Sequence, residues 1–250
     1  MNPHLMNITT TRKALPPNLL KLNKDMVLDL GFINRYSRFF YRLIMVLVLM
    51  AGFAVGLQQS AVADDAPVRI LVLGDSLVAG HGLPQGKAFP EMLQQALLQD
   101  GVTASVINAG VSGDTTAGGL ARLDWSLADN PDAAIIVLGG NDLLRGLEPD
   151  ASYQNLEAII DRFKAENMAV LLAGMQAPRN FGTDYVTAFD QIYTRLAARG
   201  DVVFYPFFLD GVAMVPDLNL GDGMHPNEAG ISEITRRIMP SVQALLARIP

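Results

Sequence analysis

A serine, a histidine and an aspartate of this chain could together catalyse acyl transfer. The chain contains three histidines, His4, His81 and His225, and His225 stands three residues after Asp222. That spacing allows the carboxylate to bond Nδ1 of the imidazole, which leaves Nε2 to take a proton from the hydroxyl of Ser76. We therefore interpret His225 as the base, and His81, which follows the serine, as a pocket-wall or surface residue.

Acyl transfer also needs donors for the oxygen that becomes negatively charged. Asn141, in the Gly-Gly-Asn-Asp run at 139–142, could supply a side-chain N–H, and Gly113 and Ser76 could supply backbone N–H groups. Each residue also has a purely structural interpretation: Ser76 as a turn former or cap, Asn141 as an Asx-turn residue, and Asp222 as a turn or cap residue. Three further aspartates are interpreted as turn and cap residues that brace these loops: Asp75, Asp114 and Asp142.

The elements between these residues must bring them together. Five short, mostly apolar runs are predicted as strands: Arg69–Leu73, Ala104–Asn108, Ala133–Leu138, Ala169–Ala173 and Val202–Tyr205. Helical periodicity follows each of them, with first apolar positions at Phe89, Leu120, Tyr153, Tyr185 and Ile231. Repeated β-α units imply one parallel sheet between two helix layers. Because the candidate residues follow strand ends, the sequence predicts that they share one edge of the sheet.

Composition narrows the classes of function. Residues 1–63 carry seven Lys or Arg and two Asp or Glu, whereas residues 64–250 carry twelve and twenty-three, a net charge of −11. The strongly negative charge of residues 64–250 argues against nucleic-acid binding, which needs clustered basic side chains. The chain has no cysteine, which excludes disulfides, thiolate metal sites and a cysteine nucleophile.

The N-terminal residues have the pattern of an export signal. Arg35, Arg38 and Arg42 precede an uncharged apolar run over 43–57, and the small-x-small triplet at 61–63 follows. We expect cleavage after Ala63, which makes 1–63 a leader and signal peptide and leaves no membrane anchor. An uncleaved anchor is the alternative. A translation start at Met26 would account for the unusually long leader. Residues 64–250 are predicted to form one domain.

Four segments, taken together and in this order, resemble the SGNH, or GDSL, hydrolase family: Gly74-Asp75-Ser76-Leu77, the turn centred on Gly113, Gly139-Gly140-Asn141-Asp142, and Asp222-Gly223-Met224-His225-Pro226. The resemblance implies a three-layer α/β/α sandwich with a flavodoxin-like, five-stranded parallel sheet. It also implies a Ser76–His225–Asp222 triad, an oxyanion hole from Ser76, Gly113 and Asn141, and neither metal nor cofactor. The resemblance is closest to the bacterial periplasmic branch, whose members act as thioesterase, lysophospholipase and arylesterase, so the expected partner is a small acyl ester or thioester.

Apolar residues beyond the strand ends are predicted to contact the acyl group. Leu143 and Leu144 follow Asn141, and Phe181 lies in a later loop; ordinary packing under the loops is the alternative for each. Phe89 stands where relatives often have Trp, and we expect this departure from the family pattern to alter the acyl pocket.

Three other functions are compatible with parts of the pattern. Asp75, Asp114, Asp142, Asp222 and His225 could converge on a cation, as in a metal-dependent phosphoesterase. A flavodoxin-like binding module could use the same edge for a nucleotide, although no Walker loop or G-x-G-x-x-G follows the first strand. A carbohydrate O-acetylesterase would keep the same catalytic residues and change only the substrate.

Overall fold

The computed structural model describes residues 37–45 and 66–250. The chain divides into two units, Met1–Asp64 and Asp65–Pro250, and the strands found among the described residues belong to the second. Residues 37–45 are helical and include Arg38 and Arg42. Arg35, the rest of the apolar run, the triplet ending at Ala63 and the start at Met26 lie outside the described residues, so export and cleavage stay predictions. In the described part, no helix is both long and apolar enough to cross a bilayer.

Five parallel strands form the sheet, in the order β2-β1-β3-β4-β5. Their bounds are β1 Val68–Gly74, β2 Ala104–Gly110, β3 Ala133–Val137, β4 Ala169–Ala173 and β5 Val203–Tyr205. The residues of β3 and β4 are all buried, as expected when helices cover both faces of a parallel sheet. This strand order is that of flavodoxin-like sheets, and it confirms the predicted fold class.

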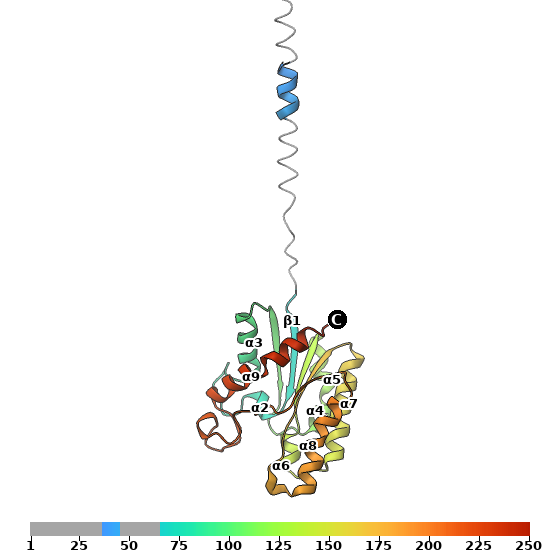
Figure 1. Cartoon of the computed structure of the whole chain (residues 1–250), viewed down its shortest axis with the longest axis vertical. Helices are drawn as coiled ribbons and strands as arrows, with labels where there is room; N and C mark the ends of the chain where they lie inside the picture. Colours follow the sequence, from blue (N-terminus) through green and yellow to red (C-terminus); the bar gives the residue numbers. More distant parts are fainter. Residues whose placement is uncertain (1–36, 46–65) are drawn as a thin grey trace, which may run out of the picture. The chain divides into compact units, whose positions relative to one another are not determined.

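Helices cover the two faces of the sheet (Figure 1). On one face, α3 (Phe89–Gln99) packs on β2, and α9 (Glu228–Leu246) packs on β4, β5 and α3. On the other, α7 (Pro149–Ala165) and α8 (Thr183–Ala197) pack on β4 and on each other, and α4 (Thr116–Ala121) packs on α7. The three long helices α7, α8 and α9 are amphipathic and turn their apolar stripes to the sheet.

Short helices differ from the sequence prediction. The single helix expected over 116–128 is divided into α4, α5 (Leu123–Ser126) and a 3₁₀ turn over Leu127–Asp129, because the backbone of Arg122 leaves helical geometry. Two segments expected to be turns are short helices instead, α2 (Ser76–Ala79) and α6 (Gly140–Leu144). Four or five residues are too few for apolar periodicity to reveal a helix.

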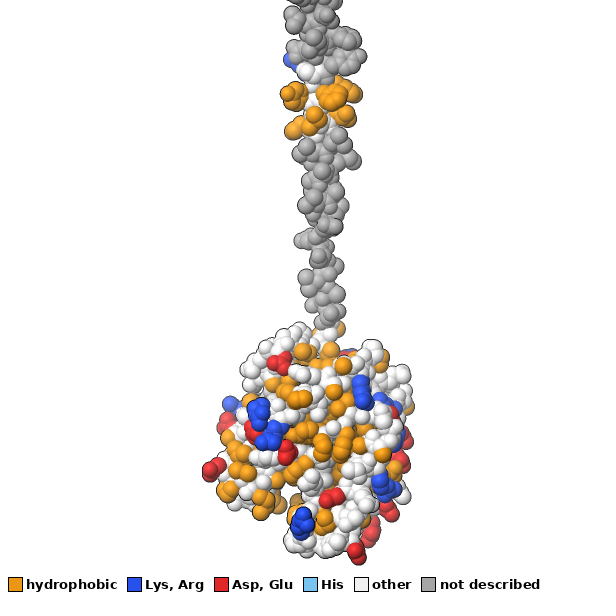
Figure 2. All heavy atoms as spheres, in the orientation of Figure 1, with side chains coloured by type: hydrophobic (Ala, Val, Ile, Leu, Met, Phe, Trp, Pro, Cys, Tyr) orange, Lys and Arg blue, Asp and Glu red, His pale blue; other side chains and the backbone are white. Residues whose placement is uncertain are grey.

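The hydrophobic core lies on both faces of the sheet and includes Phe89. Phe89 is fully buried, and its ring meets that of Phe208 edge to face, with centroids 5.1 Å apart. This residue therefore packs in the core and offers no surface to an acyl group, contrary to the expectation from its family position. Figure 2 shows one side of the surface, where hydrophobic side chains lie between basic and acidic ones.

Candidate active site

The carboxyl ends of the central strands place three loops side by side. Gly74, the last residue of β1, pairs with Gly110 of β2 and with Val137 of β3. After Gly74 the chain turns into α2, with Asp75 as its N-cap and Ser76 as its first residue. From β1 the chain crosses to β2 on one side of the sheet and then to β3 on the other. Ser76, just after β1, therefore lies at the topological switch point, where ligands usually bind in such sheets.

The structure brings the three predicted catalytic residues into one hydrogen-bonded chain. His225 Nε2 lies 2.9 Å from Ser76 Oγ, although the two residues are 149 positions apart. On the other side of the ring, His225 Nδ1 lies 2.6 Å from Asp222 Oδ2. Both distances are within the range for a base that accepts a proton from its nucleophile and for a carboxylate that orients the base.

The loop before α9 holds the carboxylate and the imidazole in place. Asp222 Oδ1 accepts the backbone N–H groups of Met224 and His225. These two bonds and the His225 side chain lower the pKa of Asp222 well below its usual value. The loop is closed by Leu220 N–H, which donates to His225 O at 2.7 Å. Asp222 therefore remains ionised and acts both as a turn residue and as the partner of the imidazole.

Three N–H groups at this edge are available to an oxyanion. Ser76 begins α2, so its N–H has no acceptor within the helix, and no acceptor for Gly113 N–H occurs among residues 66–250. Gly113 has φ +88°, and an added Cβ there would be strained although little lies nearby. Asn141 Nδ2 donates one hydrogen to Asp75 Oδ2 at 3.2 Å, which leaves its second hydrogen free.

Asp75 braces the serine and the asparagine from below. Its carboxyl is 2 % exposed and accepts both Leu77 N–H and Asn141 Nδ2. Burial raises the pKa of Asp75 from 3.8 to about 6, against the opposing effect of the hydrogen bonds from Leu77 and Asn141. Ionisation of the buried Asp75 carboxyl therefore lowers the stability of the folded state. The hydrogen bond to Asp75 fixes the direction of the Asn141 amide.

This raised pKa predicts how stability depends on pH. Because the native state keeps the Asp75 proton where the unfolded chain releases it, the contribution of Asp75 to stability falls as pH rises from about 4 to about 6. We expect the free energy of unfolding of the wild type, minus that of Asp75→Asn, to be about 2 kcal/mol larger near pH 4.5 than near pH 7. Urea unfolding of both proteins at the two pH values measures this difference, with Asp217→Asn, an exposed aspartate, as control. A pH-independent difference would contradict the raised pKa.

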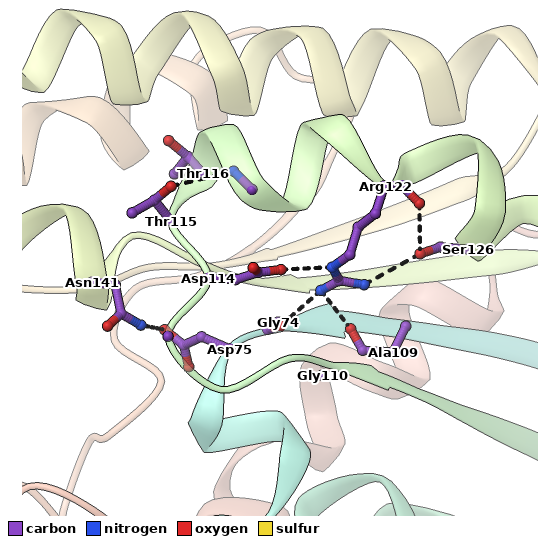
Figure 3. A network of polar contacts seen from close by, with 12 residues as sticks. Gly74, Asp75, Ala109, Gly110, Asp114, Thr115, Thr116, Arg122, Ser126 and Asn141 are labelled. Atoms are coloured by element: carbon purple, nitrogen blue, oxygen red, sulfur yellow. Dashed lines mark hydrogen bonds and ion pairs between the residues drawn. The ribbon is translucent and has the colours of Figure 1, made fainter.

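Arg122 ties the serine loop to the Gly113 loop, a role that no motif in the sequence predicts. Its guanidinium donates to Gly74 O at 3.0 Å, to Ala109 O at 2.8 Å and to Asp114 Oδ2 at 2.6 Å (Figure 3). One side chain thus satisfies carbonyls at the ends of β1 and β2 and the carboxylate that follows Gly113. Two of these three partners are backbone carbonyls, which no spacing of residue types indicates.

A second buried network ties the Gly113 loop to α6 and α7. Asp142, 1 % exposed, accepts the N–H and the hydroxyl of Thr116 and the hydroxyl of Ser152. Arg145, at the end of α6, donates to Gly113 O at 2.7 Å. The predicted bracing role of Asp75, Asp114 and Asp142 agrees with these contacts. Among the described residues, Asp75, Asp114 and Asp142 do not lie with Asp222 and His225 in a group of possible metal ligands, so the five residues considered for a phosphoesterase do not form one cation site.

The residues expected to contact an acyl group differ in exposure. Leu143 is 6 % exposed and packs in the core, so it offers little surface to a ligand. Leu144, next to it, is 59 % exposed. Phe181 is half-buried and its ring stacks on Tyr185, with centroids 5.8 Å apart. Tyr185 also donates its hydroxyl to Leu147 O at 2.8 Å, which links the start of α8 to the loop after α6.

His81 lies against the catalytic histidine. It follows Gly80, the left-handed residue that ends α2, and its N–H donates to Ser76 O. Its side chain is exposed, and the ring centroids of His81 and His225 are 4.6 Å apart. The interpretation of His81 as a surface residue holds, and the contact with His225 is an additional finding.

Comparison with known proteins finds a family and relatives of similar sequence. Residues 72–231 match the model of the GDSL-like lipase/acylhydrolase family. Esterase TesA of Pseudomonas aeruginosa is 40% identical over 191 residues, which cover 76% of this chain and 93% of the relative. The thioesterase 1/protease 1/lysophospholipase L1 of Escherichia coli K12 is 40% identical over 176 residues, covering 70% of this chain and 82% of the relative.

A solved structure of similar sequence has the same fold. AlinE4, described as an SGNH-hydrolase family esterase, is 45% identical and superposes with a TM-score of 0.61. The match covers 72% of this chain and 97% of AlinE4. The family-model match over residues 72–231 begins within β1, includes β2 to β5, and contains the loops that carry Ser76, Gly113, Asn141 and His225.

Proposed function

The chain belongs to the GDSL-like lipase/acylhydrolase family, and on this premise we propose that it hydrolyses acyl esters or thioesters with Ser76 as nucleophile, His225 as base and Asp222 as the group that orients the base. The observation that carries the proposal is the continuous chain of contacts, 2.9 Å from Ser76 Oγ to Nε2 and 2.6 Å from Nδ1 to Asp222. A structural role for each residue alone would not require this alignment.

The reaction follows from the positions of these groups. Ser76 Oγ attacks the carbonyl carbon of the substrate while His225 Nε2 takes its proton, and the resulting imidazolium is stabilised by the Asp222 carboxylate. His225 then gives the proton to the departing alcohol or thiol, which leaves an acyl group on Ser76. Water activated by the same imidazole attacks the acyl-enzyme and releases the acid. No proton has to travel beyond Nε2 in either half of the reaction.

Charge on the carbonyl oxygen is stabilised by N–H groups that are already in place. We assign this role to Ser76 N–H, Gly113 N–H and the second hydrogen of Asn141 Nδ2. The loops that carry them are joined by Arg122, Arg145 and Asp75. Donors fixed before the reaction need no reorganisation when the charge develops.

Removal of one donor is expected to slow the chemical step. Asn141→Ala should lower kcat by roughly 10²–10³-fold with a much smaller change in KM, because the amide acts on the transition state. Steady-state kinetics with a nitrophenyl ester measures both constants. Gln154→Ala, which removes an exposed amide from α7, serves as the matched control. An Asn141→Ala enzyme with unchanged kcat would show that the amide is not an oxyanion donor.

The substrate class is proposed from the apolar residues near the site and from the relatives. Leu144 is exposed beyond Asn141, and Phe181 is half-buried in the 3₁₀ turn before α8; both could contact a hydrocarbon chain. We propose that the substrate has a medium or long acyl chain, present as a simple ester, as the acyl ester of a lysophospholipid, or as a thioester.

A chain-length series of nitrophenyl esters and acyl-CoA thioesters tests both the activity and the preference. We expect kcat/KM to rise from acetyl to longer acyl groups, since each buried methylene is worth about 0.8 kcal/mol. A maximum at acetyl would remove the assignment of Leu144 and Phe181 and favour the acetylesterase alternative. No turnover of any member would contradict the proposed activity.

We propose also that the protein is exported, with the periplasm as its place of action. The support is the arrangement of Arg35, Arg38 and Arg42 before the apolar run over 43–57 and the triplet that ends at Ala63. Mass spectrometry of the exported protein should find Asp64 at its N-terminus. An intact segment from Arg35 to Ala63 would refute cleavage.

A further inference from the structure

Two imidazoles and one carboxylate meet at the rim of the active site. His81, Asp222 and His225 each offer one ligand atom, and these atoms all lie within 4.8 Å of one another. All three residues border solvent, with His81 and Asp222 exposed and His225 half-buried. The catalytic chain explains Asp222 and His225, but it leaves the imidazole of His81 without a role.

From this cluster we infer that the protein binds Zn²⁺ at His81, Asp222 and His225, and that the ion reversibly inhibits hydrolysis. Zinc prefers imidazole nitrogen and carboxylate oxygen, and three protein ligands with a fourth, open position are a common arrangement. Magnesium and calcium prefer oxygen ligands and have only one carboxylate in this set. The inference on binding stands independently of the proposed function; the inhibition rests on it.

The geometry needs only a small rearrangement to close on an ion. Ligand atoms of a tetrahedral zinc site are about 3.3 Å apart, given metal–ligand bonds of about 2.0–2.1 Å. Asp222 and His225 are already in contact at 2.6 Å. The backbone of His81 is held by its bond to Ser76 O, while its imidazole makes no hydrogen bond to any of the described residues and can turn toward His225.

Occupation of the cluster would remove the base from catalysis by either ring nitrogen. Zinc on His225 Nε2 takes the lone pair that receives the Ser76 proton, and zinc on Nδ1 replaces the bond to Asp222. In both cases Ser76 loses its general base. The described part of the domain contains two histidines, His81 and His225, and the chain has no cysteine, so nitrogen or sulfur ligands for a competing high-affinity zinc site are lacking there.

The first test compares zinc inhibition of the wild type with that of His81→Phe, which keeps a ring beside His225 but has no ligand atom. Ester hydrolysis is measured in a buffer that does not bind metal, with increasing zinc chloride, and each protein is referred to its own metal-free rate. We expect the half-inhibitory zinc concentration to rise by about tenfold or more in His81→Phe, because a three-ligand site becomes a two-ligand site. Chelator should restore the wild-type rate, magnesium chloride should not inhibit, and Asp217→Asn should behave as the wild type.

The second test measures zinc binding without any activity, by calorimetry on Ser76→Ala and on Ser76→Ala with His81→Phe. Binding to the first protein, weakened at least about tenfold in the second, supports the site even if the protein proves not to be an esterase. Equal zinc sensitivity of wild type and His81→Phe, or no binding to Ser76→Ala at millimolar zinc, would overturn the inference.

Discussion

Ser76→Ala is expected to abolish hydrolysis, with kcat reduced on the order of 10⁶-fold. The substitution removes the atom that forms the acyl-enzyme and leaves His225 without the hydroxyl that lies 2.9 Å from its Nε2. The loss is as large as that of the whole triad, because the nucleophile, base and carboxylate act as one unit. The rate acceleration that remains in the variant comes from the oxyanion donors and from substrate binding.

Single-turnover and steady-state assays with a nitrophenyl ester measure this loss. Ser232→Ala is the matched control, since Ser232 is an exposed residue of α9 whose hydroxyl donates to Glu228 O of the same helix. Far-ultraviolet circular dichroism of Ser76→Ala should match that of the wild type, because the α2 cap is supplied by Asp75. A folded Ser76→Ala enzyme that kept more than a small fraction of its rate would show that another residue is the nucleophile.

Asp222→Asn is expected to lower kcat by about 10⁴-fold while the loop keeps its shape. The asparagine retains one oxygen for the N–H groups of Met224 and His225, which Asp222 Oδ1 accepts. The other position becomes an NH₂ group that donates to His225 Nδ1. The imidazole is then driven to the tautomer with its proton on Nε2, which cannot accept a proton from Ser76.

Two comparisons separate this tautomer effect from a loss of structure. Asp222→Ala removes the loop bonds as well, so it should lose thermal stability that Asp222→Asn keeps, whereas both should lose activity. Asp217→Asn removes an exposed charge from the same loop region and should retain the wild-type kcat. If Asp222→Asn retained activity within tenfold of the wild type, the carboxylate would have no orienting role.

The sheet could be predicted from the sequence because its strands are apolar runs. Each of the five strands begins and ends within two residues of its predicted limits, and the alternation with amphipathic helices indicated parallel pairing. The helix from 116 to 128 was predicted as one piece and is divided at Arg122. At this break the Arg122 side chain bonds Gly74, Ala109 and Asp114, which are tertiary contacts that local periodicity does not record.

The site could be predicted to the level of residues but not of geometry. Strand ends place Ser76, Gly113 and Asn141 at one edge, and the scarcity of histidine indicated His225. The resemblance to a known family joined them into one reaction. The shifted pKa of Asp75 and the contact of His81 with His225 depend on burial and on side-chain direction. Neither property follows from residue spacing, so only the structure reveals them.

A fluorophosphonate probe tests the central assignment most directly. The probe reacts with a serine whose hydroxyl is deprotonated by an adjacent base, and fluoride leaves as the Oγ–P bond forms. After incubation of the purified protein, proteolysis and mass spectrometry should find the tag on the peptide that contains Gly74-Asp75-Ser76-Leu77, at Ser76, and no tag in Ser76→Ala. A tag on a different serine, or none on an enzyme that hydrolyses esters, would contradict the assignment of Ser76 as nucleophile.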